Sequence, residues 1–112
     1  PAAPAPSAPA PATPATPAAL AYADVKPVLS ARCASCHAGT FFPAAAAAYP
    51  LTLSNDDADF AETVARTNPQ TPDASLLLTK ALGQAHGGGA VLTAGSTEHT
   101  TLVQWIQGGA AR

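Results

Sequence analysis

The sequence predicts a small all-α domain preceded by a proline-rich segment. Residues 1–19 consist almost wholly of Pro, Ala and Thr, whereas apolar residues from Leu20 onward recur at helical spacings of three and four. Helix-start residues stand before several of these stretches, and glycine or proline follows them. We therefore expect a linker over residues 1–19 and one helical domain over residues 20–112.

Residues 1–19 have little to bury and favour extended polyproline II, so we interpret them as a semi-rigid spacer. Such spacers commonly join modules of exported proteins, and an upstream module or a lipid anchor would be consistent with this one. A disordered tail left by processing is the alternative interpretation.

Composition excludes several classes of function. A net charge of −2 with 11% charged residues gives no basic patch, so nucleic acid is not an expected partner. No apolar run is long enough for a membrane span. No Arg- or Lys-led signal segment is present either, so we expect this to be a mature or trimmed chain. A domain this small buries a limited core and often needs a metal or another staple.

The first expected helix begins near Ala23 or Asp24, with Pro27 in its first turn, and runs into residues 33–37. Its apolar positions are Tyr22, Val25, Val28 and Leu29.

Residues 33–37 read Cys-Ala-Ser-Cys-His and contain both cysteines of the chain. This arrangement is typical of a c-type haem attachment site, in which Cys33 and Cys36 form thioethers and His37 is the proximal iron ligand. A redox disulfide is the first alternative, but nothing flanking the motif alternates like a strand. A zinc site is the second, but structural zinc normally needs four ligands from separated pairs.

The segment over residues 38–53 is interrupted by Gly39, Pro43 and Pro50, with one helical turn expected over 44–48. Phe41 and Phe42 are candidates for contact with the haem edge or for ordinary core packing.

Ser54 to Asp57 form a helix-start signal, which predicts a helix over 56–66 that buries Phe60 and Val64. We interpret Asp56, Asp57 and Asp59 as a solvated helix start; calcium binding is a weaker alternative because no full ligand loop follows.

Thr71 and Pro72 are expected to start a helix over 73–82 that ends at Gly83, with Leu76, Leu77 and Leu78 mostly inward. Lys80 is expected to be solvated, with approach to a haem propionate as the alternative. Ser96 is expected to cap a last helix over 97–107, whose Trp105 packs on the first helix near Tyr22 or Leu29.

His86 precedes three glycines, which permit a close approach of backbone to another group such as a haem face. The chain has no methionine, so the usual axial thioether is missing. We favour His86 as distal iron ligand, with an open site or His99 as alternatives. The glycines lack the flanking strand, helix and lysine of a phosphate-binding loop.

Residues 20–110 resemble a class I c-type cytochrome, and more closely the cytochrome c domains of planctomycete type. The strings that carry this resemblance are VLSARCASCH, PDASLLLTKALG, HGGG and LVQWIQGGA. The resemblance implies a helical fold around one covalent haem c held by Cys33 and Cys36. It also supports His86 as second ligand in place of methionine.

These features predict an electron carrier rather than an enzyme. Two histidine ligands would close the iron to substrates and lower its potential, leaving electron transfer to or from a partner protein or fused enzyme. The alternatives are a five-coordinate haem for gas binding, sensing or peroxide chemistry, and a haem that serves chiefly to fold the domain. Because haem c is attached outside the bacterial cytoplasm, we expect a periplasmic or secreted protein.

Overall fold

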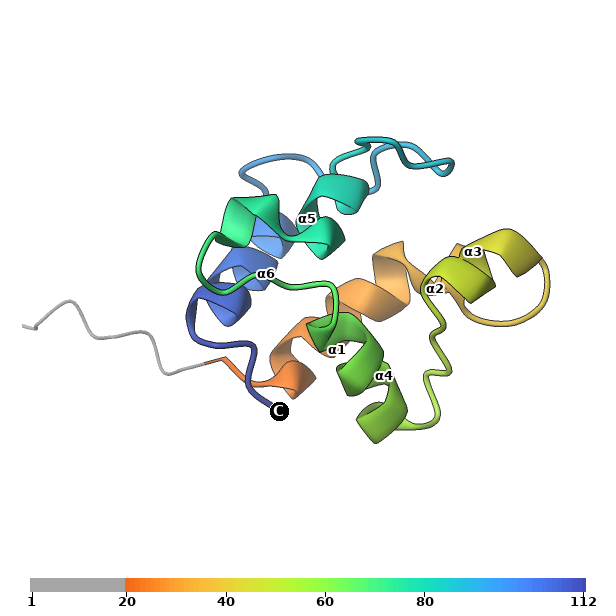
Figure 1. The fold of residues 1–112 in the computed structure, drawn as a ribbon, viewed down its shortest axis with the longest axis horizontal. Coiled ribbons are helices and arrows are strands. Elements are labelled where there is room, and N and C mark those ends of the chain that lie inside the picture. The colour runs from red at the N-terminus through yellow and green to blue at the C-terminus, as the bar shows by residue number, and fades with distance from the viewer. Residues whose placement is uncertain (1–19) are drawn as a thin grey trace, which may run out of the picture.

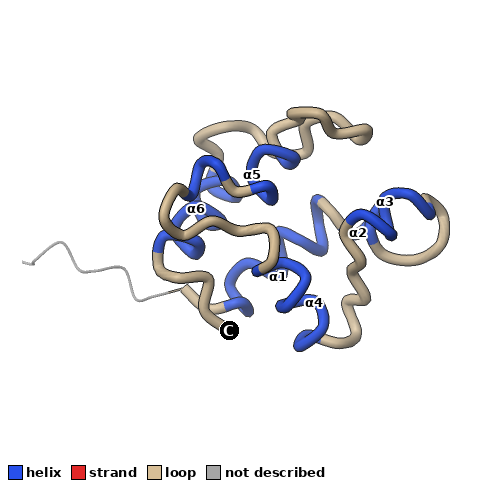
Figure 2. The backbone as a smooth tube through the Cα atoms, in the orientation of Figure 1, coloured by secondary structure: helices blue, strands red, loops and turns tan. Residues whose placement is uncertain are grey.

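The computed structural model describes residues 20–112, and the linker expected over residues 1–19 lies outside this range. The described chain contains only helices, turns and loops, with two isolated β-bridges and no β-strand, as Figure 2 shows by colour. The predicted all-α class is therefore confirmed. The helical elements are α1 (Tyr22–Arg32), α2 (Ala34–His37), α3 (Pro43–Ala48), α4 (Asp56–Val64), η1 (Pro72–Ala74), α5 (Leu76–Ala81) and α6 (Thr97–Gln107).

Helix α1 begins at Tyr22, one or two residues earlier than expected. Asp24 accepts a hydrogen bond from the Ala21 amide at 2.8 Å, so its carboxylate satisfies a donor at the helix start from inside the first turn. Pro27 consequently lies inside the helix rather than in its first turn. The missing amide of Pro27 would have bonded to the Ala23 carbonyl, and both residues are exposed, so water can take the place of that bond.

The core is centred on the packing of α1 with α6, which lie together in Figure 1. Trp105 of α6 is fully buried, and its ring lies 6.2 Å from that of Tyr22 in α1, as predicted. The indole Nε1 donates to the Ala111 carbonyl at 2.8 Å, and Ala111 in turn forms a bridge with Ala21. Both ends of the described chain are therefore anchored to the same core.

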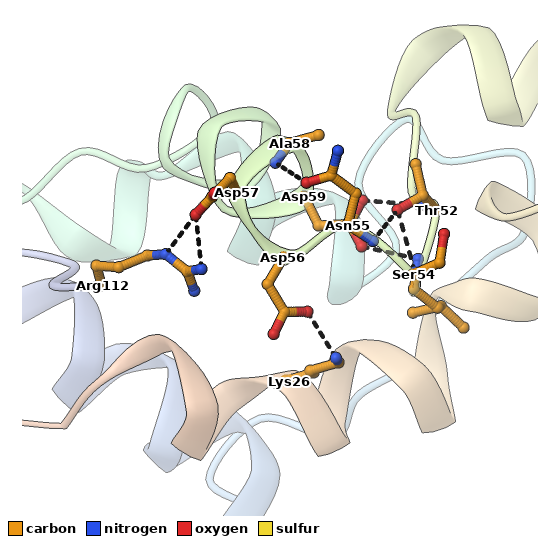
Figure 3. A network of polar contacts seen from close by, with 10 residues as sticks. Lys26, Thr52, Ser54, Asn55, Asp56, Asp57, Ala58, Asp59 and Arg112 are labelled. Carbon is orange, nitrogen blue, oxygen red and sulfur yellow. Dashed lines mark hydrogen bonds and ion pairs between the residues drawn. The ribbon is translucent and has the colours of Figure 1, made fainter.

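Helix α4 ends two residues before the expected Arg66, because Arg66 and Thr67 form tighter turns on Thr63 and Val64. Phe60 and Val64 are only half-buried, whereas Thr63 and Asp59 are fully buried. The prediction that Asp59 belongs to a solvated helix start was wrong. Its carboxylate folds inward onto backbone amides of the preceding loop, as Figure 3 shows, while Asp57 stays exposed.

The helix expected over 73–82 is divided in two. The 3-10 turn η1 stops at Ser75, whose hydroxyl is buried and accepts a hydrogen bond from the Asn68 amide at 2.7 Å. Helix α5 then begins at Leu76, with Leu77 and Leu78 buried as predicted and Leu76 half exposed. Helix α6 has the predicted bounds, and the Ser96 hydroxyl accepts from the His99 amide at its start.

Candidate functional site

The two thiols and the first histidine share one turn at the end of α1. Cys33 ends α1 and begins α2, and its carbonyl accepts hydrogen bonds from the amides of Cys36 and His37 at 3.2 and 3.0 Å. Both thiols are free and half-buried. Burial raises the pKa of the Cys33 thiol to about 11, with the neighbouring Cys36 thiol as the second cause. In the free polypeptide Cys33 is thus a protonated, weakly reactive thiol rather than a redox-active thiolate.

The orientation of His37 is fixed by contacts with three residues that follow it in the sequence, Ala45, Tyr49 and Leu51. Its Nδ1 donates to the Ala45 carbonyl of α3 at 2.7 Å, and its own carbonyl accepts from the Leu51 amide at 3.2 Å. The ring of Tyr49 lies 5.3 Å from the imidazole. Because a carbonyl only accepts, the proton of the neutral ring is on Nδ1, which leaves Nε2 with a free lone pair. This is the arrangement found for histidines that bind metals.

His86 has the same kind of support. Its Nδ1 donates to the Gly89 carbonyl at 2.7 Å, so its Nε2 is also left with a free lone pair. Gly88 packs against the ring: a Cβ at this residue would lie 3.3 Å from Cε1 of His86. The run of glycines therefore allows a backbone carbonyl and an imidazole to meet at close range.

The structure brings the two imidazoles together, although they are far apart in the sequence. Their ring centroids are 6.0 Å apart and their planes are within 6° of parallel. Metal–imidazole bonds of about 2 Å on each side, with about 1 Å from nitrogen to ring centre, would give a similar spacing of about 6 Å. The spacing also falls within the range of a direct aromatic pair. The centroid separation alone therefore suits one metal atom between the rings and equally suits a directly stacked pair of imidazoles.

Both rings and both thiols line a cavity of ≈ 680 Å³, formed by the end of α1, by α2, α3 and α5, and by the loop after α5. This volume is in the range of pockets for drug-sized molecules and cofactors. The lining is largely apolar and includes Phe41, Phe42, Leu77 and Val91. Phe41 is 86% exposed and Phe42 is 48% exposed, so the alternative that they pack in the core was wrong. They are apolar groups available to a molecule in the cavity.

Two residues of this site were not identified from the sequence. Tyr49 is buried beside His37 and shares a hydrogen bond with Thr63, and burial raises the pKa of its phenol above the usual range. The guanidinium of Arg66 lies over the Tyr49 ring at 4.7 Å and donates to the carbonyls of Ala48 and Glu62. The contacts of Tyr49 with Thr63 and Arg66 join segments distant in the sequence, so no local pattern signals them.

The remaining candidates lie elsewhere. His99 is in the first turn of α6, where its Nδ1 accepts from the Gly95 amide at 3.1 Å, and it does not line the cavity. A smaller pocket of ≈ 340 Å³ beside α1 contains Lys26, Asp56 and Arg112, but Lys26 pairs with Asp56 and Arg112 with Asp57. Opposite charges that neutralise each other leave this pocket with no evident ligand.

Metal binding by protein groups alone is not indicated in residues 20–112, where no three His, Cys, Asp or Glu side chains come together. A porphyrin would change this requirement, because it supplies four ligands and needs only one or two from the protein. No helix of the described chain has the length and apolar character for crossing a membrane.

Comparisons with models of protein families, with curated proteins and with solved structures found no match. The assignment of function therefore depends on the chemistry of residues 33–37 and His86.

Proposed function

We propose that residues 20–112 form a mono-haem c-type cytochrome domain of class I type, with bis-histidine ligation, that transfers electrons. The observation that carries this proposal is the facing pair His37 and His86, 6.0 Å apart, each with Nδ1 engaged by a carbonyl and Nε2 free. The adjacent thiols of Cys33 and Cys36 have the spacing needed for two thioether bonds.

The donor set and the cavity both fit a haem. A flat apolar cofactor needs an apolar lining, which Phe41, Phe42 and the side chains of α5 provide. Cys33 and Cys36 would hold the macrocycle covalently, and His37 and His86 would hold its iron. When bound, the haem supplies an iron that cycles between the ferric and ferrous states.

The residues of the chain restrict what the site can do. With an imidazole on each side, no coordination position is left for a substrate, so outer-sphere electron transfer is the activity that remains. Nitrogen in place of a methionine thioether lowers the reduction potential relative to a histidine–methionine cytochrome. The carbonyls of Ala45 and Gly89 increase the basicity of the two imidazoles, which favours the ferric state further.

The expected partner is a redox protein or an enzyme module joined through residues 1–19. Electron-transfer encounters use small and weak interfaces, so the domain does not require a large docking surface. Because bacterial haem c is attached outside the cytoplasm, we place the protein in the periplasm or outside the cell.

The proposal is tested on protein matured in a host that attaches haem c. Mass spectrometry should give the mass of the polypeptide plus one haem, and the ferric protein should have the low-spin electron paramagnetic resonance spectrum of two imidazole ligands. His86→Ala should convert this spectrum to high spin and allow carbon monoxide to bind readily to the ferrous form.

His99→Ala is the matched control, because His99 lies outside the cavity, and its spectrum should remain low-spin. A mass equal to the bare polypeptide would rule out covalent haem. High-spin ferric iron in the unmodified protein would instead favour the five-coordinate alternative, with gas binding or peroxide chemistry at an open position. If His99→Ala lost the low-spin spectrum and His86→Ala kept it, His99 would be assigned as the distal ligand in place of His86.

A further inference from the structure

The loop over residues 83–90, which carries His86, is closed at its base. The Ala81 carbonyl at the end of α5 accepts hydrogen bonds from the amides of Val91 and Leu92, at 2.8 and 3.0 Å. Gly83, with a φ of +100°, packs so closely on the far end of the loop that a Cβ there would lie 3.0 Å from the Ala90 nitrogen. The two ends of the loop are therefore held together by backbone contacts.

The tip of the loop has fewer constraints. Within it, the His86 carbonyl accepts from the Gly89 amide at 2.9 Å, and His86 Nδ1 donates to the Gly89 carbonyl. These bonds fix the ring relative to the loop. The amides of Gly83 and Gln84 donate to the carbonyls of Lys80 and Thr79, each at 3.0 Å, so backbone bonds hold the loop to α5 as far as Gln84. Residues 85–89 make no such backbone bond to described residues outside the loop, and three glycines in succession add conformational freedom.

One side chain supplies this missing constraint. Lys80 Nζ donates to the carbonyl of Ala85, the residue directly before His86, at 2.6 Å. Among residues 20–112, Lys80 is the only side chain outside the loop that hydrogen-bonds to residues 83–90. Ala85 has a φ of +46°, a left-handed conformation that is unfavourable for alanine. The ammonium therefore offsets a local cost at the residue that sets the direction of His86.

The support is rigid because Lys80 belongs to α5. Its neighbours Leu77, Leu78 and Ala81 are all at most 5% exposed, so the helix is anchored in the core. A contact made by an anchored helix restricts a loop more strongly than a contact made by a second loop would.

We propose that Lys80 is the positioning residue that holds His86 toward the cavity and so keeps the sixth iron position closed. This inference rests on the proposed function and deepens it. The contact has the strength of a charge-assisted hydrogen bond, so its loss should raise the fraction of protein with His86 detached by about tenfold. A probe that binds only the detached form measures that fraction directly.

The experiment uses matured protein and carbon monoxide as the probe. Lys80→Met keeps the length of the side chain but has no donor, and Lys80→Arg keeps a cationic donor. In the ferrous state, Lys80→Met should bind carbon monoxide with an apparent affinity about tenfold above that of the unmodified protein. Lys80→Arg should restore most of the closed state.

Lys26→Met is the matched control, because it removes the same charge from an ion pair with Asp56 and lies outside the cavity. An unchanged carbon monoxide affinity in Lys80→Met would overturn the inference. So would an equal increase in Lys26→Met, which would reveal a general effect of net charge.

His86→Ala separates this failure from failure of the proposed function. If His86→Ala becomes high-spin while Lys80→Met behaves like the unmodified protein, only the role of Lys80 is wrong. If His86→Ala stays low-spin, the ligand assignment and the role of Lys80 are wrong together. Should Lys80→Met fail to mature, Lys80→Gln against Lys80→Arg gives the same comparison, with the higher affinity expected for Lys80→Gln.

Discussion

Asp59→Ala should destabilise the protein strongly, although Asp59 belongs to a run of acidic residues of the kind that is usually solvated. Its side chain is fully buried, and its two carboxylate oxygens accept from the amides of Thr52 and Leu53 at 2.7 and 2.8 Å (Figure 3). Leu53 has a φ of +60°, so the bond to its amide also holds a left-handed residue in place. Alanine would leave both amides without an acceptor.

The magnitude follows from these two bonds. A hydrogen bond to a charged group contributes about 1.5–3 kcal/mol, and two bonds that share one carboxylate should together contribute about 3–5 kcal/mol. For a domain of this size, each kcal/mol lowers Tm by about 4–8 °C, so we expect a loss of at least about 12 °C. Asp59→Asn retains one acceptor oxygen but turns an NH₂ group toward the second amide, so it should lose about half as much.

The assay is thermal unfolding of the matured protein, followed by far-ultraviolet circular dichroism at neutral pH. Asp57→Ala is the control, because this residue lies on the same helix, its side chain is 88% exposed, and within residues 20–112 it pairs only with Arg112. Loss of an exposed ion pair costs at most about 1 kcal/mol. If the two alanine variants unfold at the same temperature, the argument from burial and amide binding is refuted.

Two further predictions concern the histidine loop and the tyrosines. Gly88→Ala should push its methyl group against the His86 ring, at 3.3 Å from Cε1, and increase high-spin character in the ferric electron paramagnetic resonance spectrum. The methyl group of Gly87→Ala meets nothing within 4 Å, so this variant should show no increase in high-spin character. Equal spectra for the two variants would contradict the packing argument. Burial, as the first cause, raises the pKa of both Tyr22 and Tyr49 above the usual value of 10.0, so their contribution to stability is present below that pH and is lost as pH rises above it. Near-ultraviolet difference absorbance should therefore show phenolate appearing together with loss of helical circular dichroism, and a separate ionisation of the native protein near pH 10 would argue against this.

The local patterns of the sequence were sufficient for the approximate positions of the helices and for the bounds of α6. Ser96 and Gly108 define the bounds of α6 through local hydrogen bonds, and the spacing of apolar residues identified the buried face of α1. They were insufficient at Ser75 and Asp59, where polar side chains fold inward onto amides of other turns. Such bonds depend on which segments meet, and local spacing does not contain that information.

The site divides in the same way. Residues 33–37 are a local motif, so the sequence by itself led to the cofactor attachment and to the role of His37 that we propose. The sequence also singled out His86, but only its neighbouring glycines and the lack of methionine pointed to it. Tertiary structure alone decided that His86 faces His37 across one cavity, that Tyr49 and Arg66 pack beside them, and that Lys80 holds the loop. The reason is that a ligand pair needs two chain segments at a fixed separation, and that separation is set by how α1, α5 and α6 pack rather than by any spacing along the chain.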